Sequence, residues 1–88
     1  MKIKNNFEVV KIADDYTLLP AGEQIETFNG LIVLNEVSAF LLEKLKKDLS
    51  KEELVNLLIN EYEVDIDTAK ADVDRMVEEM QRVGILDD

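Results

Sequence analysis

The chain contains no cysteine and no histidine, and these two absences exclude several kinds of chemistry. Without cysteine it can form no disulfide and offers no thiolate nucleophile, and without either residue it lacks the usual zinc ligands. The absence of histidine also removes the most common general acid or base near neutral pH. We therefore expect no catalytic residue, no cofactor and no metal site.

Proline and glycine are also scarce, with one proline and three glycines in 88 residues. No stretch rich in glycine and serine divides the chain, so we expect a single domain over residues 1–88. No apolar run approaches the roughly 18 residues that a membrane span needs, and the first residues lack the apolar segment of a signal peptide. These features predict a soluble, cytoplasmic protein.

Basic residues are few compared with acidic ones, 10 against 20, so the net charge is −10. The excess lies mostly in residues 36–88, which hold fifteen acidic and seven basic residues. A surface of this sign repels phosphate groups and anionic lipids, which argues against nucleic acid and membrane partners. Many of these acidic residues need no role beyond solubility.

The first third of the chain has the composition of β-strands. β-branched and aromatic residues predict strands over about 7–13, 16–20 and 30–34. Asp14-Asp15 is expected to form the turn between the first two, and Asn29-Gly30 a turn before the third.

The remainder has the apolar spacing of three helices, over about 36–49, 51–63 and 68–83. Asn35 can cap the first helix, and Ser50 with Glu53 forms a capping box for the second. Asp67 is expected to cap the third helix and Gly84 to end it. The predicted fold class is α+β and winged helix-turn-helix-like, with a three-stranded antiparallel sheet followed by three helices.

The third strand, Leu31-Ile32-Val33-Leu34, is apolar on both faces. Burial in the centre of a sheet is one explanation. At an edge, however, such a strand presents unpaired backbone groups beside apolar side chains, with no charge or proline to protect it. An extended peptide could then add to it as a further strand.

The third helix carries more apolar surface than one core-facing stripe requires. Met76 and Val83 widen that stripe on one side only, and Asp72 and Glu79 border them. These residues either contact the first strands or form the wall of a peptide groove, where methionine suits tolerant contacts.

Several short motifs occur together in a fixed order. They are Phe28-Asn29-Gly30-Leu31-Ile32-Val33-Leu34-Asn35-Glu36, then Glu61-Tyr62-Glu63-Val64-Asp65, then Ala69 followed by Asp72-Val73, and finally Gly84-Ile85-Leu86. In this order and spacing the chain resembles the PqqD-like family of peptide chaperones, also called RiPP recognition elements, over roughly residues 7–86.

The resemblance implies a non-catalytic domain that binds the leader of a ribosomally made precursor peptide by strand addition. It implies peptide-binding residues at Leu31, Ile32, Val33, Leu34, Asp72, Met76, Glu79 and Val83. It also implies a maturation enzyme as second partner, radical S-adenosylmethionine enzymes being one class, in natural product biosynthesis. A homodimer through the exposed edge strand is a further possibility.

Four other functions fit parts of the sequence. A winged-helix DNA-binding protein needs a basic recognition helix, whereas the third helix is net negative. An acyl carrier protein needs Asp-Ser-Leu, whereas this chain has Asp48-Leu49-Ser50. An enzyme would have to use acidic pairs such as Asp72 and Glu79. A general protein–protein adaptor would use the same edge strand.

Overall fold

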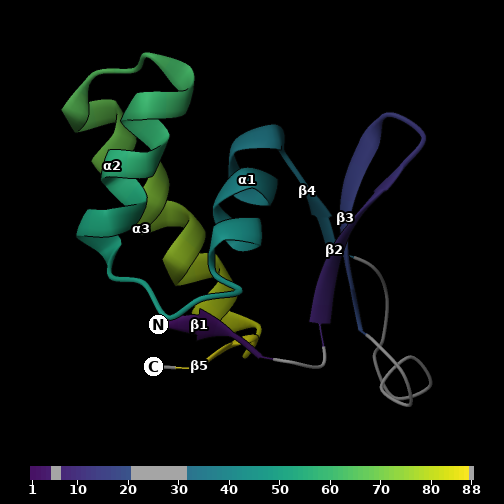
Figure 1. Ribbon diagram of the computed structural model, residues 1–88. Helices are drawn as coiled ribbons and strands as arrows, with labels where there is room; N and C mark the ends of the chain where they lie inside the picture. Colours follow the sequence, from purple (N-terminus) through teal and green to yellow (C-terminus); the bar gives the residue numbers. More distant parts are fainter. Residues whose placement is uncertain (5–6, 21–31, 88) are drawn as a thin grey trace.

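The computed structural model describes residues 1–4, 7–20 and 32–87. In these residues the strands and helices follow one another in the order shown in Figure 1: β1 Lys2–Ile3, β2 Phe7–Ile12, β3 Asp15–Pro20, β4 Ile32–Leu34, α1 Glu36–Lys44, α2 Lys51–Tyr62, α3 Ile66–Arg82 and β5 Leu86–Asp87. Strands β2, β3 and β4 form a three-stranded antiparallel sheet, and the three helices follow it. The predicted α+β class is confirmed.

Strands β2 and β3 form the predicted hairpin, but its turn lies one residue earlier than expected. Ile12 pairs with Asp15, so the turn residues are Ala13 and Asp14 rather than Asp14 and Asp15. This register places Lys11 directly across from Tyr16, and the Lys11 ammonium lies 5.6 Å from the centre of the tyrosine ring. Ala13 accommodates the tight turn with a φ of 55°, in the left-handed region.

Helix α1 packs on the sheet and contacts all three of its strands. The covered face carries Val9 of β2, Leu18 of β3 and Leu34 of β4, because side chains alternate between the two faces of a strand. Leu18 and Leu34 belong to the core, which continues between the three helices through Leu41, Leu54 and other apolar residues: Leu42, Leu45, Leu58, Ala69, Val73, Val77 and Met80.

Helix α1 ends at Lys44 and not near residue 49 as the sequence predicted. The residues after Lys44 bond to β1 instead of continuing the helix. The Ile3 amide donates to the carbonyl of Leu45, and the Leu49 amide donates to the carbonyl of Met1, each at 2.9 Å. These tertiary hydrogen bonds have no local sequence signal.

The helix caps agree with the sequence in two of three helices. The Asn35 side chain accepts from the Ser38 amide, and Ser50 and Glu53 form the predicted capping box. The cap of α3 is Asp65 and not Asp67, because the Asp65 carboxylate accepts from the Thr68 amide at 2.7 Å. The helix therefore begins at Ile66, and Asp67 becomes an acidic residue of its first turn.

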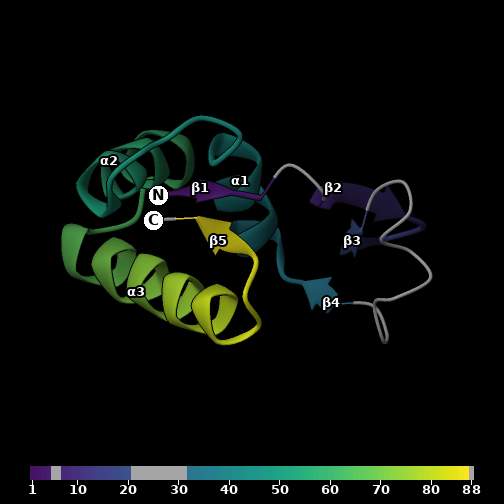
Figure 2. The ribbon, with the colours of Figure 1, turned by 90° about the horizontal axis from the view of Figure 1, so that it is seen from below.

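A second, two-stranded sheet joins the two ends of the chain (Figure 2). Lys2 pairs with Asp87 and Ile3 with Leu86. Gly84, with a φ of 78°, ends α3 and turns the chain back, so that Ile85 and Leu86 are buried as expected. The pairing itself was not predicted, because two-residue strands are too short for a periodic pattern.

Candidate functional site

Strand β4 lies at an edge of the three-stranded sheet. It pairs with β3 on one side, and within the residues that the structure describes no strand pairs with its other side. Of the two explanations for its apolar sequence, the central position is therefore wrong. Its free side presents backbone donors and acceptors that a further strand could use.

The side chains of β4 differ in their exposure. Leu34 is buried under α1, Ile32 is partly buried, and Val33 is 67% exposed on the opposite face. Leu31, the first residue of the predicted peptide-binding strand, lies outside the described residues, as do the Asn29-Gly30 turn and Phe28. The described part of β4 thus has one side chain buried in the core, Leu34, and one exposed apolar side chain, Val33.

A hollow of about 370 Å³ lies where the chain leaves β4 and enters α1. It separates the start of α1 from the middle of α3, and eight residues line it: Asn35, Glu36, Val37, Ser38, Asp72, Arg75, Met76 and Glu79. The structure thus brings Asp72, Met76 and Glu79, all predicted from the sequence, into one hollow beside the end of β4. Val83 and the β4 residues lie outside this lining.

The other lining residues were missed by the sequence analysis. Four of them, residues 35–38, follow β4 directly in the sequence. Their position next to the predicted peptide-binding strand could have identified them. Arg75 is the fifth, and its guanidinium bonds to the Asp72 carboxylate at 2.8 Å. Glu36 and Glu79 make no ion pair within residues 1–4, 7–20 and 32–87, so the hollow is net negative and suits a basic or neutral ligand group.

Met76 and Val83 differ sharply, although the sequence grouped them. Val83, at the end of α3, is 49% exposed and can serve as an apolar contact. Met76 is only 2% exposed and belongs to the core, so the expectation of a partly hydrated shoulder at Met76 is wrong. The physical reason is that Met76 lies on the side of α3 that packs into the core, whereas Val83 is the cap residue after the last turn of the helix.

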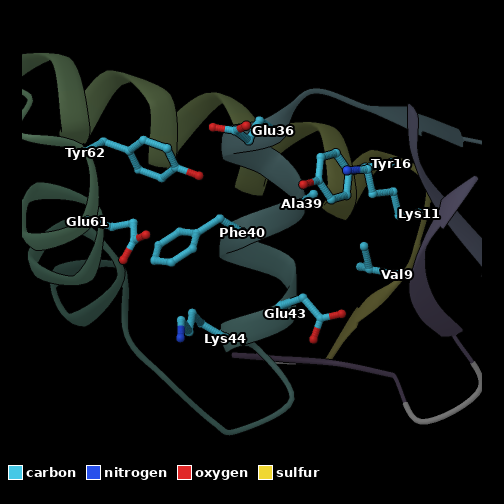
Figure 3. Close-up of a pocket in the computed structure, with 10 residues that line it drawn as sticks. All are labelled: Val9, Lys11, Tyr16, Glu36, Ala39, Phe40, Glu43, Lys44, Glu61 and Tyr62. Atoms are coloured by element: carbon cyan, nitrogen blue, oxygen red, sulfur yellow. The ribbon is translucent and has the colours of Figure 1, made fainter. Parts of the chain in front are cut away.

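A second hollow, of about 510 Å³, lies between the covered face of the sheet, α1 and the end of α2 (Figure 3). Phe40 and Tyr62 meet edge to face in it, with ring centres 5.4 Å apart. Burial and the negative charge of Glu36 raise the pKa of the Tyr62 hydroxyl above its ordinary value of 10.0. Lys44 lies 5.2 Å from the centre of the Phe40 ring, so a cation of the protein itself already covers that ring.

The described residues also bear on metal binding and on membrane insertion. Within the described part of the chain, no three acidic side chains gather closely enough to hold a metal ion. None of the helices described there has the length and apolar character that crossing a membrane requires.

Comparison with known proteins connects this geometry to a family. A family profile described as coenzyme PQQ synthesis protein D (PqqD) matches residues 16–86. No curated protein matches the chain.

Two solved structures share the fold. One is TbiB1 in complex with the TbiA(beta) leader peptide, with a TM-score of 0.75 and 24% identity over 99% of this chain and 95% of that one. The other is a lasso peptide synthetase B1 complexed with the leader peptide, with a TM-score of 0.70 and 21% identity over 96% and 93%. At these identities the likeness establishes the fold.

Proposed function

The chain belongs to the PqqD family, and from this premise we propose that it is a non-catalytic domain that binds the leader of a ribosomally made precursor peptide. In this function the leader adds as a strand to β4, and the domain presents the peptide to a modifying enzyme. The two proteins of similar fold described above were both solved with a leader peptide bound, which supports the proposal.

The observation that carries the proposal is the free side of β4. A peptide strand on this side gains main-chain hydrogen bonds, which supply affinity without regard to side chains. Side-chain contacts then select the peptide and set its register. The β4 residues in this role are Ile32, Val33 and Leu34, together with Leu31.

Helix α3 supplies the proposed second wall. We assign to it Asp72, Met76, Glu79 and Val83, and we call these residues together with residues 31–34 the β4–α3 surface. Val83 offers an exposed apolar contact, whereas Met76 is the buried floor beneath the two acidic residues. Glu79, which makes no ion pair with any residue that the structure describes, favours a leader with a basic residue at this point.

The charge of α3 disfavours the DNA-binding alternative. Its acidic residues Asp67, Asp72, Asp74, Glu78 and Glu79 outnumber Lys70, Arg75 and Arg82, and Arg75 is held in an ion pair by Asp72. Phosphate contacts need free cations on the recognition helix. An adaptor that uses β4 would share the same surface, and no separate observation favours it.

Titration calorimetry with a synthetic leader peptide tests the proposal. Val83→Asp places a charge in the proposed wall at an exposed position, and we expect leader affinity to fall about tenfold or more, or about 1.4 kcal/mol. Ile66→Asp is the matched control. Ile66 lies at the other end of the same helix, is 53% exposed, and receives the same change of charge.

The two variants separate the possible outcomes. Loss of affinity in Val83→Asp alone supports the assignment of α3 as the wall. Equal affinity in both variants removes Val83 from the site while leaving strand addition intact. A folded wild-type protein that binds no leader contradicts the proposed function.

A further inference from the structure

Lysine residues gather where α1 meets α2, although the chain as a whole is strongly acidic. Lys44 ends α1, and Lys46 and Lys47 lie in the turn that follows. All three are exposed, and together they provide three of the ten basic residues in the chain. These lysines contrast in sign with the net charge of −10 that the chain carries.

These lysines border a hollow of about 610 Å³ between the end of α1 and α2. Its apolar part is formed by the partly buried Leu49 and Leu57, and Asn56 and Asn60 add amide groups on α2. The full lining is Glu43, Lys44, Lys46, Lys47, Leu49, Glu53, Asn56, Leu57 and Asn60. We call these residues the α1–α2 hollow.

The two acidic residues of the α1–α2 hollow are already engaged. Glu43 pairs with Lys46 at 3.0 Å, and the Glu53 carboxylate accepts from the Ser50 amide at 3.1 Å in the capping box. Lys47 makes no ion pair in the part of the chain that the structure describes. The lining holds three lysines against two carboxylates, so its net charge is +1, opposite in sign to that of the chain.

The α1–α2 hollow and the β4–α3 surface lie at opposite ends of α1. Figure 1 shows β4 leading into the first residue of α1, and the connection to α2 leaving from its other end. The hollow beside β4 is net negative, whereas the α1–α2 hollow presents lysines. One domain thus carries two separate surfaces of opposite charge, and ligands of opposite charge could occupy both at once.

We propose that the α1–α2 hollow is a docking site for an acidic segment of a partner protein, with a leucine or similar aliphatic side chain seated on Leu49 and Leu57. The lysines attract the acidic groups of the segment and raise the rate of association. Leu49 and Leu57 provide an apolar contact from which water is removed on binding. A duplex or a membrane surface would bring a dense row of phosphates against the acidic remainder of the domain. A single protein segment avoids that repulsion. This proposal does not depend on leader binding at β4.

The probe is a short synthetic peptide of alternating Glu-Glu and Leu-Leu pairs, titrated into the ¹⁵N-labelled full chain and followed by NMR. We expect amide shifts confined to residues 44–60. We also expect affinity to weaken at least about tenfold when salt rises from about 0.05 M to about 0.3 M, because screening shortens the reach of exposed charges. The same peptide with lysine in place of glutamate should cause no shifts at this hollow.

Two triple variants test the lysines directly. K44Q/K46Q/K47Q should weaken binding of the acidic peptide by about tenfold or more. K4Q/K11Q/K70Q removes the same charge outside residues 44–60 and should leave binding unchanged. Leader affinity should be equal in both variants, so a failure of the leader proposal remains distinguishable.

Three results would overturn the docking site. They are shifts scattered over the whole domain, equal loss of binding in the two triple variants, and binding of anionic lipid vesicles or duplex DNA at residues 44–60 in place of the acidic peptide.

Discussion

Thr17 of β3 lies directly across from Val33 of β4, yet Thr17 is 3% exposed and Val33 is 67% exposed. The two residues share one face of the sheet, so the difference reflects position across the sheet. Thr17 stands in the central strand, with Val10 of β2 on its other side, whereas Val33 stands in the edge strand. The exposed Val33 thus belongs to the edge strand to which we propose that the leader adds.

Strand addition predicts a change in hydrogen exchange that needs no mutation. Backbone amides of β4 that face the free side should exchange with solvent about tenfold or more slowly when the leader is bound, because the added strand accepts their hydrogen bonds. NMR-detected exchange with and without leader measures this effect. Strand β2, the other edge of the sheet, is the internal control and should be unchanged; equal protection of both edges would indicate general stabilisation instead.

Met76→Asp should destabilise the fold itself. Met76 is fully packed against the core, so the variant loses its apolar contacts and buries a carboxylate without a partner. We expect the free energy of unfolding in urea to drop by about 3 kcal/mol or more. Met76→Leu keeps the volume and should cost less than about 1.5 kcal/mol. A well-folded Met76→Asp protein would contradict the burial of this position.

Ala13→Gly should stabilise the hairpin. Ala13 is exposed and has a φ of 55°, which costs an L-residue about 1–2 kcal/mol but costs glycine almost nothing. Part of the gain is lost because glycine makes the unfolded chain more flexible. The net increase should be about 0.5 kcal/mol, seen as a rise of about 2–4 °C in Tm. A lower Tm would mean that the turn has a different backbone conformation.

The cap of α3 predicts a specific loss of stability in acid. The Thr68 amide donates to the Asp65 carboxylate, which lowers the pKa of Asp65 below its ordinary value of 3.8. Because the folded-state pKa is the lower one, this stabilisation is complete above 3.8 and is lost as the pH falls through the folded-state value. NMR titration of the Asp65 carboxyl group measures the shift.

Asp65→Asn provides the comparison for this prediction. Its amide oxygen can still cap the helix, so the variant should remain folded and lack this component of the acid dependence. An Asp65 that titrates at its ordinary value would contradict the cap.

Local patterns in the sequence determined much of this fold. The β-branched first third, the helical spacing of apolar residues, and the caps at Asn35 and Ser50 depend on neighbours within a few residues, and the structure confirms them. The edge strand could be named as a candidate because residues 31–34 are apolar on both faces. The helical projection singled out Asp72, Met76, Glu79 and Val83 on α3, and the family resemblance implied the same residues.

Tertiary structure alone decided the remaining features. Whether β4 lies at an edge or in the centre depends on strand order, which no local pattern encodes. Met76 and Val83 sit on the same side of a helical projection, but only Met76 is buried in the core. Likewise, α1 stops at Lys44 because β1, some forty residues away in sequence, forms hydrogen bonds with the next segment. The position of a strand in a sheet, the burial of a side chain and the end of a helix here depend on segments that are distant in sequence but close in space. Hydrogen bonding and burial are set by such contacts and not by the neighbours in the sequence.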